Sequence, residues 1–246
     1  MKNHLICLSI ILLYSIVAQA QFKIGVTGGM DYTKLNIHRS TANDYGIQGK
    51  TAYRVGLASE LKLNDKVFLT TDLLFSKKGF QQTVDQEATG QDHLVYQVSD
   101  VDVSLNYIEM PIVPEFKLGF KKMNVLFGVG PYLAYGFGGK FEGNIHSGTT
   151  TTHFNEDFYW SKSSWNPDED PTKVLVQSLH QSNIKRFDFG PIVRFGVEFN
   201  KLSINAEYQY GVPNLFCEWR KYESIHTQRL GLSLKYLLWA KSAKHL

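Results

Sequence analysis

The feature that most constrains this chain is a series of segments in which apolar and polar residues alternate. The clearest of them is residues 201–213. One parity of this segment holds Leu202, Ile204, Ala206, Tyr208, Tyr210 and Val212. The other parity holds Ser203, Asn205, Glu207, Gln209 and Gly211. A period of two residues is typical of a β-strand with one apolar face and one polar face.

The same alternation predicts eight strands in total. They cover roughly residues 22–37, 50–63, 66–80, 102–120, 123–141, 184–200, 201–213 and 225–239. Short polar turns are expected at 64–65, 121–122 and 200–201, and long connections at 38–49, 81–101, 142–183 and 214–224. Tight turns at one end and long loops at the other are the arrangement of outer-membrane β-barrels, whose short turns are periplasmic.

The two faces of the predicted strands suit lipid outside and a polar interior. In residues 184–200, several Phe residues alternate with Arg186, Asp188, Arg194 and Glu198. Outward aromatics also gather near strand ends, as the two interfacial girdles of a membrane barrel do. These are Tyr32, Tyr53, Tyr135, Phe137 and Tyr210 at the loop ends, and Phe120, Phe127, Phe199 and Trp239 at the turn ends. The prediction is an all-β, eight-stranded antiparallel up-and-down transmembrane β-barrel; the alternative is a periplasmic β-sandwich.

The N-terminus has the pattern of a secretory signal. Lys2 precedes an apolar run over residues 5–17, and Ala18-Gln19-Ala20 forms a small-residue cleavage site. The alternative is an uncleaved anchor, although the run is short for a transmembrane helix. We therefore expect a cleaved signal peptide over 1–20, an outer-membrane barrel over 21–240 with a long external loop at 142–183, and a periplasmic tail over 241–246.

Composition narrows the possible partners. Lys and Arg total 26 against 23 Asp and Glu, which gives a formal net charge of +3. This near-balance argues against nucleic-acid binding, which normally needs a basic stripe or cluster. After the signal only Cys217 remains, so no disulfide within the chain is expected.

The inward parity of the strands collects eight acids and eight bases. Eight strands enclose only enough room for side chains or one small ligand, and charges in so narrow a space must be paired. We therefore expect a salt-bridged polar plug; the alternative is a narrow ion path or a small-ligand pocket. The predicted network comprises Arg54, Glu60, Asp72, Glu109, Glu115, Arg186, Asp188, Arg194, Glu198, Glu207, Arg229 and Lys235, with Lys23, Asp31, Lys62 and Lys117 on the same parity.

No motif in the sequence predicts catalysis, a cofactor or a metal. A hydrolase at the barrel rim would need clustered His and carboxylates. Only Asp92-His93 and His153 with Glu156-Asp157 hint at this, and no nucleophile elbow accompanies them. Asp168-Glu169-Asp170 lacks the regular ligand spacing of a calcium loop. The expectation is a protein that is not an enzyme and has no cofactor.

Six short segments in order resemble one known family. They are 22–32 (FKIGVTGGMDY), 72–79 (DLLFSKKG), 106–111 (NYIEMP), 128–132 (GVGPY), 187–190 (FDFG) and 208–211 (YQYG). Together they are similar to the PorT-like outer-membrane β-barrel family of Bacteroidota. The resemblance implies an eight-stranded outer-membrane barrel without catalytic residues. The protein that gives the family its name is linked to protein secretion across the outer membrane. Two features depart from the family: the length of 142–183 and a C-terminus without a terminal aromatic residue.

The expected function is that of a non-enzymatic scaffold in the cell outer membrane, surrounded by its lipid. Its external loops would bind a ligand or another envelope protein. Tyr159, Trp160 and Trp165 are the candidate contacts, because aromatic residues dominate binding hot spots. A loop that only masks the surface is the alternative for this segment. The alternative functions are an accessory role in outer-membrane protein secretion or transport, and a barrel-rim hydrolase.

Overall fold

The computed structural model describes residues 21–38, 47–82, 86–89, 95–147, 149–157, 185–214 and 224–241. In these residues the chain forms ten strands. They are β1 (Phe22–His38), β2 (Ile47–Lys62), β3 (Val67–Gln82), β4 (Gln86–Thr89), β5 (Val95–Phe120), β6 (Met123–Ser147), β7 (Thr150–Asp157), β8 (Phe187–Phe199), β9 (Leu202–Tyr210) and β10 (Ser224–Lys241). None of the described residues belongs to a helix long and apolar enough to span a membrane.

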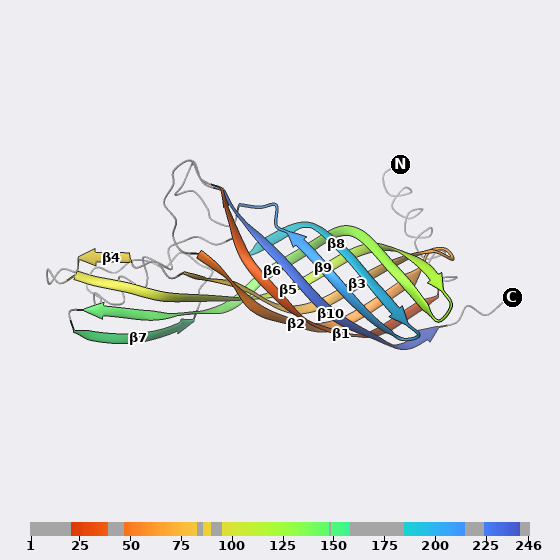
Figure 1. The fold of residues 1–246 in the computed structure, drawn as a ribbon, viewed down its shortest axis with the longest axis horizontal. Coiled ribbons are helices and arrows are strands. Elements are labelled where there is room, and N and C mark those ends of the chain that lie inside the picture. Colours follow the sequence, from red (N-terminus) through yellow and green to blue (C-terminus); the bar gives the residue numbers. More distant parts are fainter. Residues whose placement is uncertain are drawn as a thin grey trace, which may run out of the picture.

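Eight of these strands form a closed antiparallel ring. Its order is β1-β2-β3-β5-β6-β8-β9-β10, and β10 pairs with β1 to complete it. Figure 1 shows these strands tilted around a common interior. The prediction of an eight-stranded antiparallel barrel is confirmed. The predicted signal (1–20) and residues 242–246 of the predicted tail lie outside the described residues.

Burial alternates along the strands as the sequence pattern predicts. In β8 almost every second residue is buried. Phe195 is 55% exposed on the outer face, while its neighbour Arg194 is only 1% exposed inside. The outer face is thus apolar and the interior polar, which is the reverse of a soluble protein and the pattern of a barrel in lipid.

The three short turns lie at one end of the barrel. In the first, the Oδ1 of Asn64 accepts hydrogen bonds from the backbone N–H groups of Lys66 (2.9 Å) and Val67 (2.8 Å), which closes an Asx turn. The Nζ of Lys62 lies 2.9 Å from the Oδ1 of Asp65, and this hydrogen bond lowers the pKa of the exposed Asp65 carboxyl. The other turns each begin with a left-handed residue, Lys121 (φ 50°) and Asn200 (φ 56°), as tight hairpins require.

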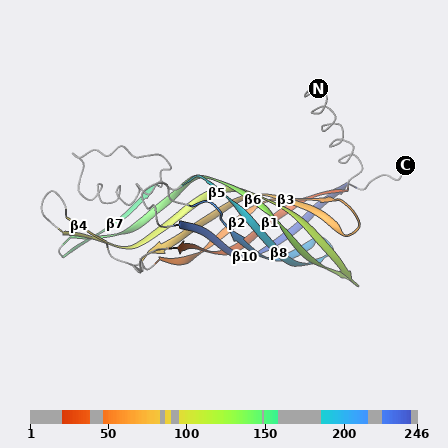
Figure 2. The same cartoon turned by 90° about the horizontal axis from the view of Figure 1, so that it is seen from above.

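A four-stranded sheet projects from the opposite end. Strands β5 and β6 have 26 and 25 residues and continue past the ring. There β4 pairs with β5 and β7 pairs with β6, so the order is β4-β5-β6-β7 (Figures 1 and 2). We call this extension the projecting sheet.

The sequence prediction made these two strands too short. It began one at residue 102 and ended the other at residue 141, and it placed loops beyond these residues. The structure instead has strand over 95–101, 142–147 and 150–157. The register of β5 with β6 shifts between Asn106 and Tyr107 and again between Ser99 and Asp102. In β5 the odd-numbered residues stay buried from Ser99 to Lys117, but beyond Tyr107 the apolar residues Leu105, Val103 and Val101 occupy this inner parity and no longer the outer one. In β6 the buried parity changes from even to odd between Gly136 and Phe141, where the bulge lies. The apolar alternation of the barrel therefore does not continue into the projecting sheet.

The inner side of the projecting sheet carries an apolar cluster. Phe80, Val103 and Phe141 lie side by side on β3, β5 and β6. The rings of Phe141 and Phe154 are 5.2 Å apart between centroids. Val101, Val103 and Leu105 are buried with them. This apolar cluster gives the projecting sheet a core of its own, next to the external end of the barrel.

Candidate functional site: the barrel interior and its rim

The middle of the barrel interior is organised around the guanidinium of Arg194. Its Nη2 donates to Asp72 (2.8 Å), and its Nη1 donates to Glu115 (2.8 Å) and Thr70 (3.1 Å). Its Nε lies 3.2 Å from Glu207. All of these side chains are buried. Three carboxylates from β3, β5 and β9 therefore converge on one cation.

A second group of charges lies between this centre and the external end. The Nη1 of Arg54 donates to Glu207 (2.7 Å), and its Nη2 lies 3.5 Å from Asp31. The guanidinium of Arg229 lies 2.9 Å from Glu109 and 3.9 Å from Asp31. Because Glu207 also contacts Arg194, the two groups form one continuous network.

The sequence prediction missed one central cation, Lys78. Its Nζ donates to Asp188 (2.8 Å) and lies 3.3 Å from Glu109. The ammonium also lies over the rings of Tyr132 (4.7 Å) and Tyr107 (5.1 Å), a favourable cation–π geometry. The predicted outward residues of this strand are odd-numbered, so the parity of position 78 would have identified it.

Another cluster occupies the turn end of the interior. The Nζ of Lys117 donates to both Glu60 and Glu198, each at 2.6 Å. Lys23 donates to the other oxygen of Glu60 at 2.8 Å. Lys117 also lies over the ring of Phe68, 4.4 Å from its centroid. Ions are thus paired along the whole described length of the interior.

Two predicted members lie elsewhere, and these are corrections. Arg186 is exposed on the outer side, where its Nη1 donates to the hydroxyl of Tyr135 (3.1 Å). It precedes the first residue of β8, so the alternation of that strand does not extend to it. Lys62 pairs with Asp65 in the turn. The remaining predicted members, Arg54, Glu60, Asp72, Glu109, Glu115, Asp188, Arg194, Glu198, Glu207, Arg229 and Lys235, are buried in the interior.

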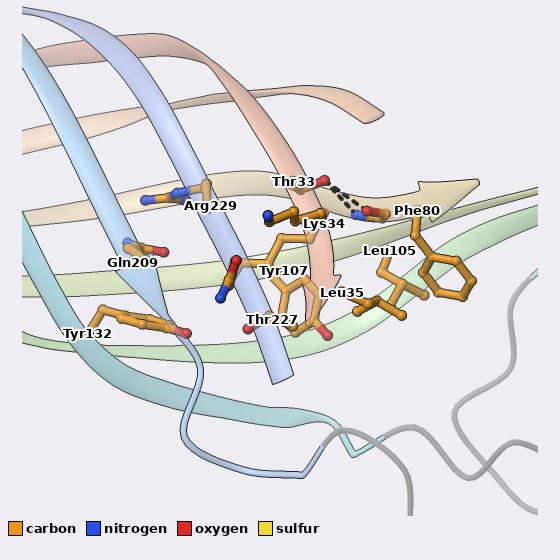
Figure 3. Close-up of a pocket in the computed structure, with 13 residues that line it drawn as sticks. Thr33, Lys34, Leu35, Phe80, Leu105, Tyr107, Tyr132, Gln209, Thr227 and Arg229 are labelled. Carbon is orange, nitrogen blue, oxygen red and sulfur yellow. Dashed lines mark hydrogen bonds between the residues drawn. The ribbon is translucent and has the colours of Figure 1, made fainter. Parts of the chain in front are cut away.

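The interior leaves little free space. A cavity of about 20 Å³ lies below the apolar cluster, between Phe80 and Leu105 on one side and Tyr107, Tyr132 and Arg229 on the other (Figure 3). This is room for about one water molecule.

Glycines let the charged side chains approach the wall of the barrel closely. A Cβ on Gly231 would lie 1.8 Å from the Oδ1 of Asp31, and a Cβ on Gly128 would lie 2.8 Å from the Cγ of Glu115. These wall positions are therefore filled by neighbouring side chains, which makes the interior a packed plug.

At the rim, the structure brings together polar residues that the sequence did not connect. The Oγ of Ser99 lies 2.9 Å from the Nε2 of His146, and the Nδ1 of His146 lies 2.9 Å from the Oγ1 of Thr151. Ser99 also donates to Asp100 (3.2 Å). The second partner of His146 is thus the hydroxyl of Thr151, which cannot stabilise an imidazolium as a carboxylate does. This group is hence best described as a hydrogen-bonded network on the sheet.

The other rim candidates are not gathered into a site. His153 contacts Asn144 (3.2 Å), and Asn155, two residues on, donates to Glu142 (3.0 Å). Within the described residues, no three His, Cys, Asp or Glu side chains are grouped to hold a metal. Several candidates lie outside the described residues, namely Asp92, His93, Tyr159, Trp160, Trp165 and Asp168–Asp170.

The sequence matches the model of one protein family, described as the outer membrane protein beta-barrel domain, over residues 17–217. The chain belongs to this family. It is therefore an outer-membrane β-barrel protein, in agreement with its closed ring and its apolar outer face. A search of curated protein sequences gives no match.

Several solved structures are similar in chain path. Ail of Yersinia pestis, solved in complex with the heparin analogue sucrose octasulfate, is 11% identical, with 89% of this chain and 99% of that chain covered and a TM-score of 0.38. Neisserial surface protein A is 9% identical, with 87% and 97% covered and a TM-score of 0.39. OprG from Pseudomonas aeruginosa is 11% identical, with 89% and 95% covered and a TM-score of 0.39.

Proposed function

We propose that this barrel is a non-enzymatic scaffold that presents the projecting sheet as a binding platform for another protein outside the cell. The observation that carries the proposal is the free edge of β7. Among the described strands, β7 pairs only with β6. All of its residues except Phe154 are exposed.

An unpaired strand edge offers a row of backbone N–H and C=O groups to an incoming extended segment. The platform behind it is held in shape, because Phe154 packs on Phe141 in the apolar cluster. It is also anchored, because β5 and β6 run without interruption from the barrel into the sheet. A rigid support lowers the ordering cost that a partner must overcome on binding.

The interior suits a supporting role. Its charges are paired with one another, and the cavity below the apolar cluster has room for about one water molecule. This favours a scaffold over a channel or an enzyme. A closer relation to the PorT-like group, with a part in protein secretion, remains a second proposal that rests on the six sequence segments alone. Export through a cleaved signal over 1–20 is likewise proposed from the sequence.

Single proline substitutions at Thr151 and Thr152 test the proposal. Consecutive N–H groups of an antiparallel strand point to opposite edges, so one proline removes a donor of the β6–β7 ladder and the other a donor of the free edge. The partner would be captured by a photocrosslinker at His153 in native membranes, with Lys121 on the turn side as the control position.

We expect an adduct from His153 and none from Lys121. The free-edge proline should abolish this adduct while leaving the protease resistance of the projecting sheet unchanged. An adduct that survives both prolines would contradict edge pairing. No adduct from His153 in a folded protein would contradict the platform itself.

A further inference from the structure

The outer surface of the barrel carries a cationic and aromatic cluster around Lys77. The Nζ of Lys77, on β3, lies 5.4 Å from the ring centroid of Tyr53. The ring of Tyr53 lies 6.3 Å from that of Phe75, which in turn lies 6.0 Å from that of Phe137. We call these four residues the Lys77 cluster. It extends along the barrel wall from β2 to β6.

A matching cluster surrounds Arg186, just before β8. Its guanidinium carbon lies 6.0 Å from the ring centroid of Tyr135, and its Nη1 donates to the Tyr135 hydroxyl at 3.1 Å. The ring of Phe187 meets that of Tyr135 edge-on, with centroids 5.0 Å apart. These three residues form the Arg186 cluster. It is contiguous with the first, because Tyr135 and Phe137 are successive outward residues of β6.

Among the described residues, neither cation has an acidic partner. In the part of the chain that the structure describes, no carboxylate pairs with Lys77 or Arg186, whereas Lys78, next to Lys77, is paired with Asp188 inside the barrel. Ring faces and a hydroxyl orient the two outer cations and leave their positive charge available. An outward positive charge of this kind attracts an anionic ligand.

Both clusters lie in the half of the barrel that is remote from the short turns. Lys77 follows Phe75 by two residues toward the end where β3 reaches the projecting sheet, and Arg186 lies at the end of β8 that is remote from the Asn200 turn. The aromatic residues are exposed, Tyr53 at 47% and Phe187 at 66%. Exposed aromatic belts mark the level of lipid head groups in membrane barrels, so the two cations lie at the external head-group level.

We propose that Lys77 and Arg186 form a binding site for the phosphate groups of outer-leaflet lipid head groups. Strands β3 and β8 are separated by β5 and β6, three steps of about 4.8 Å, or roughly 15 Å in all. That span suits a head group with two phosphates, with the guanidinium binding one phosphate through two hydrogen bonds. The aromatic rings between the two cations then contact the sugar and acyl parts of the same lipid.

The test uses the full-length protein in nanodiscs of phosphatidylcholine doped with lipid A, either bis-phosphorylated or dephosphorylated. Lipid retention is measured by native mass spectrometry. We expect Lys77→Ala/Arg186→Ala to lower the affinity for the bis-phosphorylated lipid roughly 25-fold, since each interfacial cation contributes about a factor of five. Lys77→Arg/Arg186→Lys should retain it. The matched control, Lys122→Ala/Lys201→Ala, removes two exposed lysines from the turn side and should have no effect.

Three results would overturn the proposal, once an unchanged heat-modifiable gel shift shows that each variant is folded. The first is equal retention by the wild type and the double alanine variant. The second is equal retention of the phosphorylated and dephosphorylated lipids. The third is displacement of the lipid by an equal concentration of inorganic phosphate, because this would identify a site for free phosphate.

Discussion

Arg194 on β8 and Glu207 on β9 stand opposite each other in the antiparallel register, and both side chains point into the barrel. The Nε of Arg194 lies 3.2 Å from the Oε1 of Glu207. Glu207 in turn binds Arg54, and Arg194 binds Asp72 and Glu115. This pair thus connects the charges of the middle of the barrel with those of its external half.

Replacing Arg194 by Leu should destabilise the barrel by about 3–5 kcal/mol, because it leaves buried carboxylates without their cation. Glu207→Leu should cost less, since Arg194 keeps two other carboxylates. Urea unfolding of the protein in lipid vesicles measures both. The control is Asp65→Asn, which removes an exposed ion pair of little energetic value. A near-neutral Arg194→Leu variant would contradict a tightly paired interior.

The purified protein should not conduct ions. Paired charges fill the interior, and the cavity below the apolar cluster measures only about 20 Å³. Planar-bilayer recordings are the measurement, with a large general porin in the same membrane as the positive control. Stable and reproducible conductance steps from the folded protein would show that the plug is open.

Phe141→Ala should loosen the projecting sheet without unfolding the barrel. Removing a buried Phe costs about 3–5 kcal/mol, and Phe141 packs on Phe154 outside the ring of strands. Hydrogen exchange should therefore rise in β7 and in the outer part of β6, while the amides of β9 remain protected. The exposed outer residue Phe195 provides the control, Phe195→Ala. Simultaneous loss of protection in all strands would mean that sheet and barrel unfold as one unit.

Ser99 should not behave as a nucleophile. Its hydroxyl contacts both His146 and Asp100. The Nδ1 of His146 contacts the hydroxyl of Thr151, where a catalytic triad would have a carboxylate. A fluorophosphonate probe should leave Ser99 unlabelled. Replacing His93, His146 and His153 by Ala should leave every hydrolytic activity of purified outer membranes unchanged. Labelling that disappears in Ser99→Ala would instead establish a rim enzyme.

The sequence alone determined the strands of the ring, their inner and outer faces and the short turns. The reason is local: a strand with lipid on one side and polar groups on the other must alternate residue by residue. Arg194 and Glu207 could be assigned to the interior from their own parity. The outward position of Phe195 follows from the same rule.

Only the tertiary structure decided which charges meet and where the sheet extends. Arg194 binds Asp72 and Glu115, far away in sequence, because closure of the ring brings β3, β5 and β8 around one axis. Beyond Asn106 the apolar residues of β5 change to the inner parity, and in β6 the bulge exchanges the two faces, so the alternation of the barrel does not lead into the projecting sheet. Arg186 lies outside because it precedes β8, whose alternation of buried and exposed residues begins at Phe187. Which side chains from distant strands meet depends on how the ring closes, and the alternation within one strand does not specify this.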